Sequence, residues 1–208
     1  MSYCSDLTRE RIMECAKAEF LKKGFQAAQL KDIVAEAKVT TGAVYRHFKD
    51  KEALFYALIE DVYTYTLNFL GTAVVIDTEG VKKSIEEDSF ESSYTQTMIY
   101  VDYMYEHLEE FQLLLKCSKG SRVENFIEEI TDRYAMQNTE FVRLAYEAGC
   151  AKCKPSDMEI HILTHGYITA LCECISHDVP YDDAKGYIKN ITRFQHYGWY
   201  GVLGLPIK

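Results

Sequence analysis

The sequence predicts an all-α protein, with an amino-terminal three-helix domain over residues 1–50 and a larger helical domain over residues 51–208. Apolar residues recur at three- and four-residue spacing through most of the chain, and glycine or capping residues stand at the ends of these segments. No strand pattern of useful length and no internal repeat accompanies them. Prolines occur only at positions 155, 180 and 206, so long helices can form between them.

Residues 28–48, AQLKDIVAEAKVTTGAVYRHF, predict two short helices joined by a tight turn. The spacing of Leu30, Ile33 and Ala37 provides the first helix with an apolar face, and Thr40 or Thr41 can cap the second. Small residues open the second helix, and hydroxyl, phenol, guanidinium and imidazole groups follow on it. Such a helix suits entry into a DNA major groove by its amino-terminal end.

Residues 41–54, TGAVYRHFKDKEAL, resemble the recognition helix and the start of the connecting helix in the TetR family of bacterial regulators. The resemblance covers about the first quarter of the chain. It implies a homodimer that binds a palindromic double-stranded DNA operator and responds to a small-molecule effector through a helical domain. Two departures are visible: Lys38 occupies a turn position that is usually glycine, and Ala28-Gln29 lacks the usual capping hydroxyl.

This interpretation assigns DNA contacts to the helix pair and its surroundings. The candidates for base edges and nearby phosphates are Thr40, Thr41, Gly42, Ala43, Tyr45 and His47. The candidates for the sugar-phosphate backbone are Lys31, Tyr45, Arg46 and Lys51.

The charge distribution agrees with a DNA-binding amino-terminal domain. The net charge is −9, but residues 1–51 hold ten basic and seven acidic residues, whereas residues 52–208 hold thirteen basic and twenty-five acidic ones. The chain has no apolar stretch long enough to span a bilayer, and its first residues do not resemble a signal peptide. We therefore expect a cytoplasmic protein without a membrane partner.

Further helices are expected along the chain. The first should cover residues 6–23 and end at Gly24, and Asp50 should cap a helix that runs to about residue 70 and links the two domains. Residues 71–89 are expected to form a break and loop. Helices should follow near residues 90–107 and 109–117.

Two Ser-x-x-Glu patterns predict capping boxes for the later helices. Ser121 with Glu124 should open a helix that continues to Ala148, and Ser156 with Glu159 should open one that ends near Ser176. The last helix is expected from about residue 180 to residue 203.

The second domain is rich in aromatic residues and methionine, which favours a cavity for an apolar or aromatic small molecule, including a cationic one. Each such residue, taken alone, is more typical of plain core. The candidate lining residues are Tyr65, Phe69, Tyr94, Met98, Met104, Phe111, Phe126, Phe141 and Tyr146.

The last two helices are apolar over more of their surface than one core requires, which favours a dimer interface. The family resemblance implies the same arrangement, with two helices from each subunit. The candidate interface residues are Ile168, Leu171, Ile175, Ile188, Ile191, Phe194 and Trp199. Gly198, Gly201 and Gly204 indicate either close helix approach or a fraying end.

Cysteines and histidines cluster in one part of the second domain. The cluster contains Cys150, Cys153, His161, His165, Cys172 and Cys174. Packing is the favoured interpretation and no metal ligand is assigned, but a metal- or redox-sensing regulator of the same fold stays open as an alternative.

The predicted function is a ligand-responsive transcriptional regulator, most simply a repressor, that uses no cofactor. An activator, or a regulator with a protein partner, is an alternative of the same fold. An enzyme is a weaker alternative, because no catalytic triad order, phosphate loop or carboxylate pair stands out in the sequence.

Overall fold

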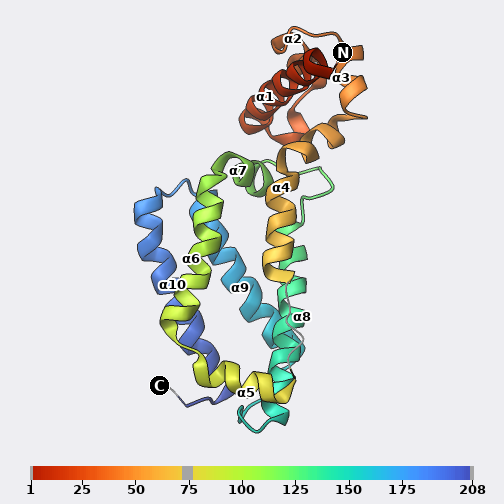
Figure 1. The fold of residues 1–208 in the computed structure, drawn as a ribbon. Coiled ribbons are helices and arrows are strands. Elements are labelled where there is room, and N and C mark those ends of the chain that lie inside the picture. Colours follow the sequence, from red (N-terminus) through yellow and green to blue (C-terminus); the bar gives the residue numbers. More distant parts are fainter. Residues whose placement is uncertain (1, 72–76, 207–208) are drawn as a thin grey trace. The chain divides into compact units, whose positions relative to one another are not determined.

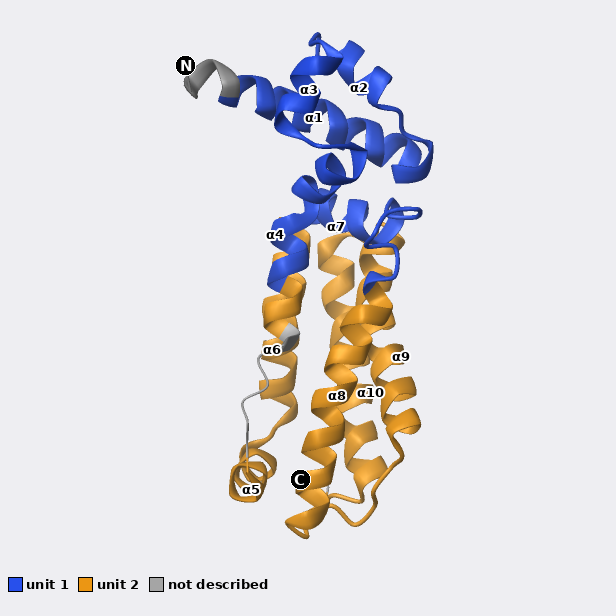
Figure 2. Ribbon diagram, turned by 90° about the vertical axis from the view of Figure 1, so that its right-hand side faces the viewer, with its two compact units in different colours: residues 1–65, 107–126 blue, residues 66–106, 127–208 orange. Residues whose placement is uncertain are grey.

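The computed structural model describes residues 2–71 and 77–206, which form ten α-helices and, within those ranges, no β-strand. The all-α prediction is therefore confirmed (Figure 1). The chain divides into two compact units (Figure 2). Unit 1 contains residues 1–65 and 107–126, and unit 2 contains residues 66–106 and 127–208. The domain boundary expected at residue 50 stays a prediction.

Unit 1 begins with α1 (Ser2–Ala27), α2 (Leu30–Glu36) and α3 (Thr41–His47). The predicted end of the first helix at Gly24 appears as a kink inside α1, where this glycine adopts φ +74°. The kink turns Phe25 inward, and its ring lies 5.1 Å from that of Phe55, which also contacts Phe20 at 5.0 Å. These three buried rings form the centre of the unit.

Helix α4 (Lys51–Gly71) starts where the sequence predicts, because the Asp50 carboxylate accepts a hydrogen bond from the Ala53 amide at 2.7 Å. Its residues up to Tyr65 belong to unit 1, and those from Thr66 onward belong to unit 2. Helix α7 (Leu108–Lys116) completes unit 1 by packing on α1. Lys17 of α1 forms an ion pair with Glu110 at 2.7 Å.

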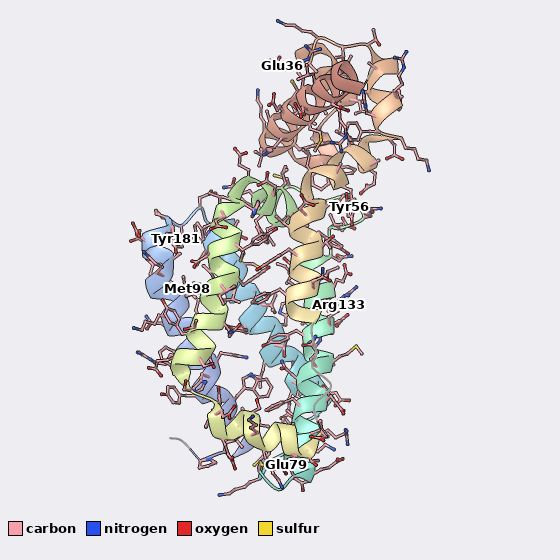
Figure 3. The ribbon with its side chains drawn as sticks, in the orientation of Figure 1. Glu36, Tyr56, Glu79, Met98, Arg133 and Tyr181 are labelled. Atoms are coloured by element: carbon pink, nitrogen blue, oxygen red, sulfur yellow. The ribbon has the colours of Figure 1, made fainter. Side chains whose placement is uncertain are left out.

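Unit 2 is built from α5 (Thr78–Glu87), α6 (Phe90–Glu106), α8 (Phe126–Glu147, from residue 127), α9 (Asp157–Ser176) and α10 (Tyr181–Leu203). Helix α10 packs on both α6 and α9. In Figure 3, Met98 marks α6 and Tyr181 marks the start of α10. One buried cluster joins Val101 of α6, Leu171 of α9 and Ile188 of α10.

Two sequence predictions are wrong, one in each unit. Residues 78–87 form α5 instead of part of a loop, because the Asp77 carboxylate caps the helix through the Gly80 amide at 2.8 Å. Residues 72–76 of the expected loop lie outside the described residues. The capping box of Ser121 and Glu124 does not form: the Glu124 carboxylate instead accepts from the Gly120 amide, and α8 begins only at Phe126.

The other predicted capping box is confirmed. The Ser156 hydroxyl accepts from the Glu159 amide at 3.3 Å, and the Glu159 carboxylate accepts from the Ser156 amide at 2.7 Å. Gly204 ends α10 in the left-handed conformation, whereas Gly198 and Gly201 lie inside the helix with open space around the position of an added Cβ.

Candidate functional site

The α2–α3 pair of unit 1 forms a helix-turn-helix whose apolar side faces inward. Ile33 of α2, Ala37 directly after α2 and Val44 of α3 are buried, and Phe48 follows α3 into the same core. These residues recur at the spacing that places them on one side of each helix. The opposite side of α3 is therefore presented to solvent.

The turn between the two helices departs from ideal geometry at the predicted position. Lys38 adopts φ +51°, the left-handed conformation that favours glycine. The absence of a capping hydroxyl before α2 is also confirmed, because Gln29 makes no side-chain cap hydrogen bond. At α3, by contrast, the Thr40 hydroxyl accepts from the Ala43 amide at 3.2 Å, which identifies Thr40 as the cap.

The solvent-facing side of α3 carries a compact set of hydrogen-bonding groups. Thr41, Gly42 and Arg46 are exposed, and Tyr45 keeps 54% of its surface exposed. His47 is half-buried at the end of the helix. A guanidinium, a phenol and a hydroxyl can thus reach a neighbouring molecule without disturbing the core.

Unit 2 contains a partly open cavity of about 460 Å³, within the range of small-molecule sites. Its walls include rings from α4, α6, α8, α9 and α10. The aromatic lining residues are Phe69, Tyr100, Tyr134, Phe141, Tyr167, Trp199 and Tyr200. Burial raises the pKa of Tyr134 to about 12, and burial together with the Asp88 carboxylate raises the pKa of Tyr200 to about 12. Both phenols therefore remain hydrogen-bond donors at neutral pH.

Polar side chains gather in one part of this cavity, which we call the polar corner: Asp88, Ser93, His196 and Tyr200. The Tyr200 hydroxyl donates to Asp88 Oδ2 at 3.0 Å, and His196 Nδ1 lies 3.1 Å from the Ser93 hydroxyl. Among the described lining residues, Asp88 is the only carboxylate. The polar corner can therefore accept hydrogen bonds or offset a positive charge.

The amino-terminal region matches known regulators. Residues 12–58 match the family model for bacterial regulatory proteins of the tetR family. A transcriptional regulator of the helix-turn-helix type from Staphylococcus aureus is 30% identical over 110 residues, which are 52% of this chain and 52% of that protein. The matched part thus spans about half the length of that curated relative.

Solved structures share the fold over most of the chain. A regulatory protein of the tetR family from Rhodococcus has a TM-score of 0.59 at 17% identity, covering 89% of this chain and 95% of that one. NalD, the secondary repressor of a multidrug efflux pump in Pseudomonas aeruginosa, has a TM-score of 0.55 at 21% identity, covering 91% and 95%. Residues 12–58 therefore form a regulatory domain of the tetR family, and the chain as a whole has the fold of these solved tetR-family structures.

In this tetR-type domain, most of the proposed DNA-contacting residues lie on or beside α3. Thr40, Thr41, Gly42, Tyr45 and Arg46 are exposed, as is Lys31 on α2, whereas Ala43 and His47 are half-buried. Lys51 has a structural role that the sequence did not suggest. Its ammonium donates to the carbonyls of Phe25 and Ala28 at 2.7 and 3.1 Å, so at most one of its three N–H groups remains for a phosphate.

Of the nine residues predicted to line a cavity, Phe69 and Phe141 line the one in unit 2. Phe111 and Phe126 are buried within unit 1, and Met104 is buried in α6. Tyr94 and Met98 pack against the buried cluster of α6, α9 and α10. Tyr146 is 48% exposed, and Tyr65 belongs to unit 1. Ring size and helical spacing in the sequence therefore could not distinguish residues that line the cavity from residues that pack in a core.

The sequence reasoning missed the polar part of the cavity. Four of its lining residues form two pairs at four-residue spacing, Ser93 with Thr97 on α6 and Thr192 with His196 on α10. Polar residues repeated on a helix face that also carries buried apolar residues would have been the signal for a polar-lined cavity.

Most of the predicted dimer residues are used within the chain. Leu171, Ile175 and Ile188 are at most 6% exposed, and Ile168 and Trp199 line the cavity, so these five side chains are poorly placed to meet a partner. Ile191 is half-buried, and Phe194 is 80% exposed. Other large apolar residues of the same two helices, which were not among these candidates, are exposed: Met158, Ile162, Leu163, Tyr187 and Tyr197.

The predicted cysteine–histidine cluster is divided in the structure. Cys172 is buried and lines the cavity, and burial raises its thiol pKa to about 12, which keeps it protonated. The amides of Lys152 and Cys153 donate to the Leu203 carbonyl, which joins the loop after α8 to the end of α10. His161 and His165 face carboxylates of α8. The closeness of these residues in the sequence therefore did not imply a common site.

Within residues 2–71 and 77–206, no helix combines the length and hydropathy of a membrane-spanning segment.

Proposed function

We propose that this chain is a cytoplasmic, homodimeric repressor that binds a palindromic operator and is released by a small molecule. The observation that carries the proposal is the α2–α3 pair, in which Thr40 caps α3 and α3 directs Thr41, Tyr45 and Arg46 to solvent. A capped helix with small residues in its first turn can enter a major groove closely.

Within this proposal, hydroxyl and phenol groups of α3 contact base edges, and Arg46 with Lys31 contacts phosphates. Arg46 is exposed near the carboxyl end of α3, where a cation is favoured and free to reach a phosphate oxygen. In a dimer, two such helices would meet successive major grooves about 34–36 Å apart.

A gel-shift and footprinting experiment on the DNA upstream of the chain's own gene tests DNA binding. We expect a protected palindrome, with Arg46→Ala weakening binding to all sequences and lowering the salt slope by about 1. Lys83→Ala, which removes an exposed cation of α5 in unit 2, should bind as the unsubstituted chain does. Failure of the pure protein to prefer any duplex would refute the proposal. Transcription with and without the protein distinguishes a repressor from an activator.

The proposed dimer uses the exposed apolar face of α9 and α10. On α10, Tyr187, Ile191, Phe194 and Gly198 follow at spacings of four, three and four residues, so they share one face. An added Cβ at Gly198 or at Gly166 on α9 would meet open space, which permits close approach of another helix. Phe194→Glu should convert a dimer to monomer in analytical ultracentrifugation, and Met136→Glu, at an exposed position of α8, should not.

The proposed effector occupies the cavity of unit 2. Its aromatic walls suit a flat apolar molecule, and the polar corner suits a cationic or hydrogen-bond-donating group on that molecule. The name of NalD associates that protein with multidrug efflux, which makes an amphipathic drug-like compound a reasonable class to test.

Because α4 contributes residues to both units, we propose that effector binding favours a conformer of α4 with lower operator affinity. A preference of ~1–3 kcal/mol for that conformer would suffice.

A further inference from the structure

Helices α8 and α9 bring two carboxylates and two imidazoles together outside the effector cavity. Glu128 and Asp132 are four residues apart on α8, and His161 and His165 are four residues apart on α9. In an α-helix this spacing places both members of each pair on one face. The two helices lie side by side in both ribbon views (Figures 1 and 2), and Asn138 of α8 donates to Thr164 of α9 at 3.0 Å.

The distances between the four groups are longer than hydrogen bonds. His161 Nε2 lies 3.7 Å from Glu128 Oε1, and His161 Nδ1 lies 3.5 Å from Asp132 Oδ1. His165 Nε2 lies 3.8 Å from the other carboxylate oxygen of Glu128. N–H···O hydrogen bonds typically measure about 2.7–3.2 Å. Two donor atoms held by one tetrahedral metal ion, each at ~2.1 Å from it, are about 3.4 Å apart.

We propose that these residues form a binding site for a divalent transition-metal ion of the zinc type. One donor atom from each of Glu128, Asp132 and His161 lies within 4.8 Å of the others, and His165 faces the same Glu128 carboxylate. Glu128 and the two histidine Nε2 atoms supply ligands to the ion. Asp132 supplies either a fourth ligand or the carboxylate that orients His161 through Nδ1.

The donor set suits this class of ion. Two neutral imidazoles and two carboxylates offer nitrogen and oxygen ligands, and their charge of −2 balances a divalent cation. The histidines are half-buried and the carboxylates exposed, so an ion can enter from solvent and small side-chain rotations can close the distances. The site contains no cysteine and therefore differs from the cluster that the sequence suggested. It does not depend on the proposed DNA-binding function.

Metal binding to the untagged, EDTA-treated full chain tests the site. Zn²⁺ titrated by calorimetry should bind at one ion per chain, and Co²⁺ should produce the visible absorption of a site with nitrogen and oxygen ligands. Zn²⁺ should also raise the melting temperature. His161→Gln and Glu128→Gln should each weaken binding at least about tenfold. Both positions are at the surface, so circular dichroism should remain unchanged.

His177→Gln is the matched control. His177 lies at the end of α9 and forms a pair with Glu173 at 2.7 Å, also at four-residue spacing, but without the second helix. Zn²⁺ affinity should be unchanged in this variant. Equal loss in His177→Gln and His161→Gln, or no stoichiometric binding at micromolar Zn²⁺, would overturn the proposal and leave the four residues as an ion-pair cluster.

Discussion

The two units place their polar side chains in different surroundings. In unit 1, the helix-turn-helix directs polar groups to solvent around a filled aromatic core of Phe20, Phe25 and Phe55. In unit 2, hydroxyl, amide, imidazole and carboxylate groups line a partly open cavity of about 460 Å³. A filled core maintains a rigid outer surface, whereas a polar-lined cavity offers hydrogen-bonding groups to a molecule that enters it. The first arrangement suits a fixed surface for DNA, and the second suits a variable small molecule.

The largest expected effect compares one phenylalanine from each unit. Phe55→Ala should lower the free energy of unfolding by ~3–5 kcal/mol, because the Phe55 ring is fully buried against Phe20 and Phe25. Phe141→Ala should cost clearly less, because Phe141 is only partly buried and lines the cavity on one side. Chemical denaturation followed by circular dichroism measures both values. Equal losses would show that the cavity wall is packed as tightly as the core of unit 1.

The next prediction concerns the charge in the cavity. Asp88→Asn should weaken binding of tetraphenylphosphonium, an aromatic cation, about tenfold, because the only described lining carboxylate is lost. Binding of neutral triphenylphosphine oxide should change little. Fluorescence quenching of Trp199, which lines the cavity, measures both affinities. Glu79→Gln, on the exposed surface of α5 (Figure 3), is the control, and an equal loss there would reassign the effect to overall charge.

A smaller effect is expected at the amino end of α3. Thr40→Ala should destabilise the protein by ~1 kcal/mol, because the Ala43 amide loses its capping hydroxyl. Thr40→Ser retains the hydroxyl and should recover most of the loss. Thermal unfolding of the three proteins measures the effect. If Ser and Ala at this position prove equally stable, the hydroxyl does not act as a cap.

The smallest prediction is a gain in stability. Lys38→Gly should stabilise the chain by ~0.5–1 kcal/mol, because glycine adopts the left-handed φ of this turn without steric conflict. Ala35→Gly, at an exposed position inside α2, should instead destabilise it by a similar amount. The melting temperatures of both variants test the turn geometry, and a loss of stability in Lys38→Gly would contradict it.

The amino-acid sequence by itself determined the all-α class, the helix-turn-helix and the Asp50 and Ser156 caps. These features depend on residues within a few positions of one another, so local spacing and capping chemistry are enough to predict them. Residue type and spacing could not tell which face of the later helices would meet the core, the cavity or solvent. Leu171 and Phe194 are both apolar residues of the last two helices, yet one is 6% exposed and the other 80%. Only the tertiary structure joined Asp88 to His196 and Glu128 to His161, because these pairs are distant in sequence and meet only when their helices pack.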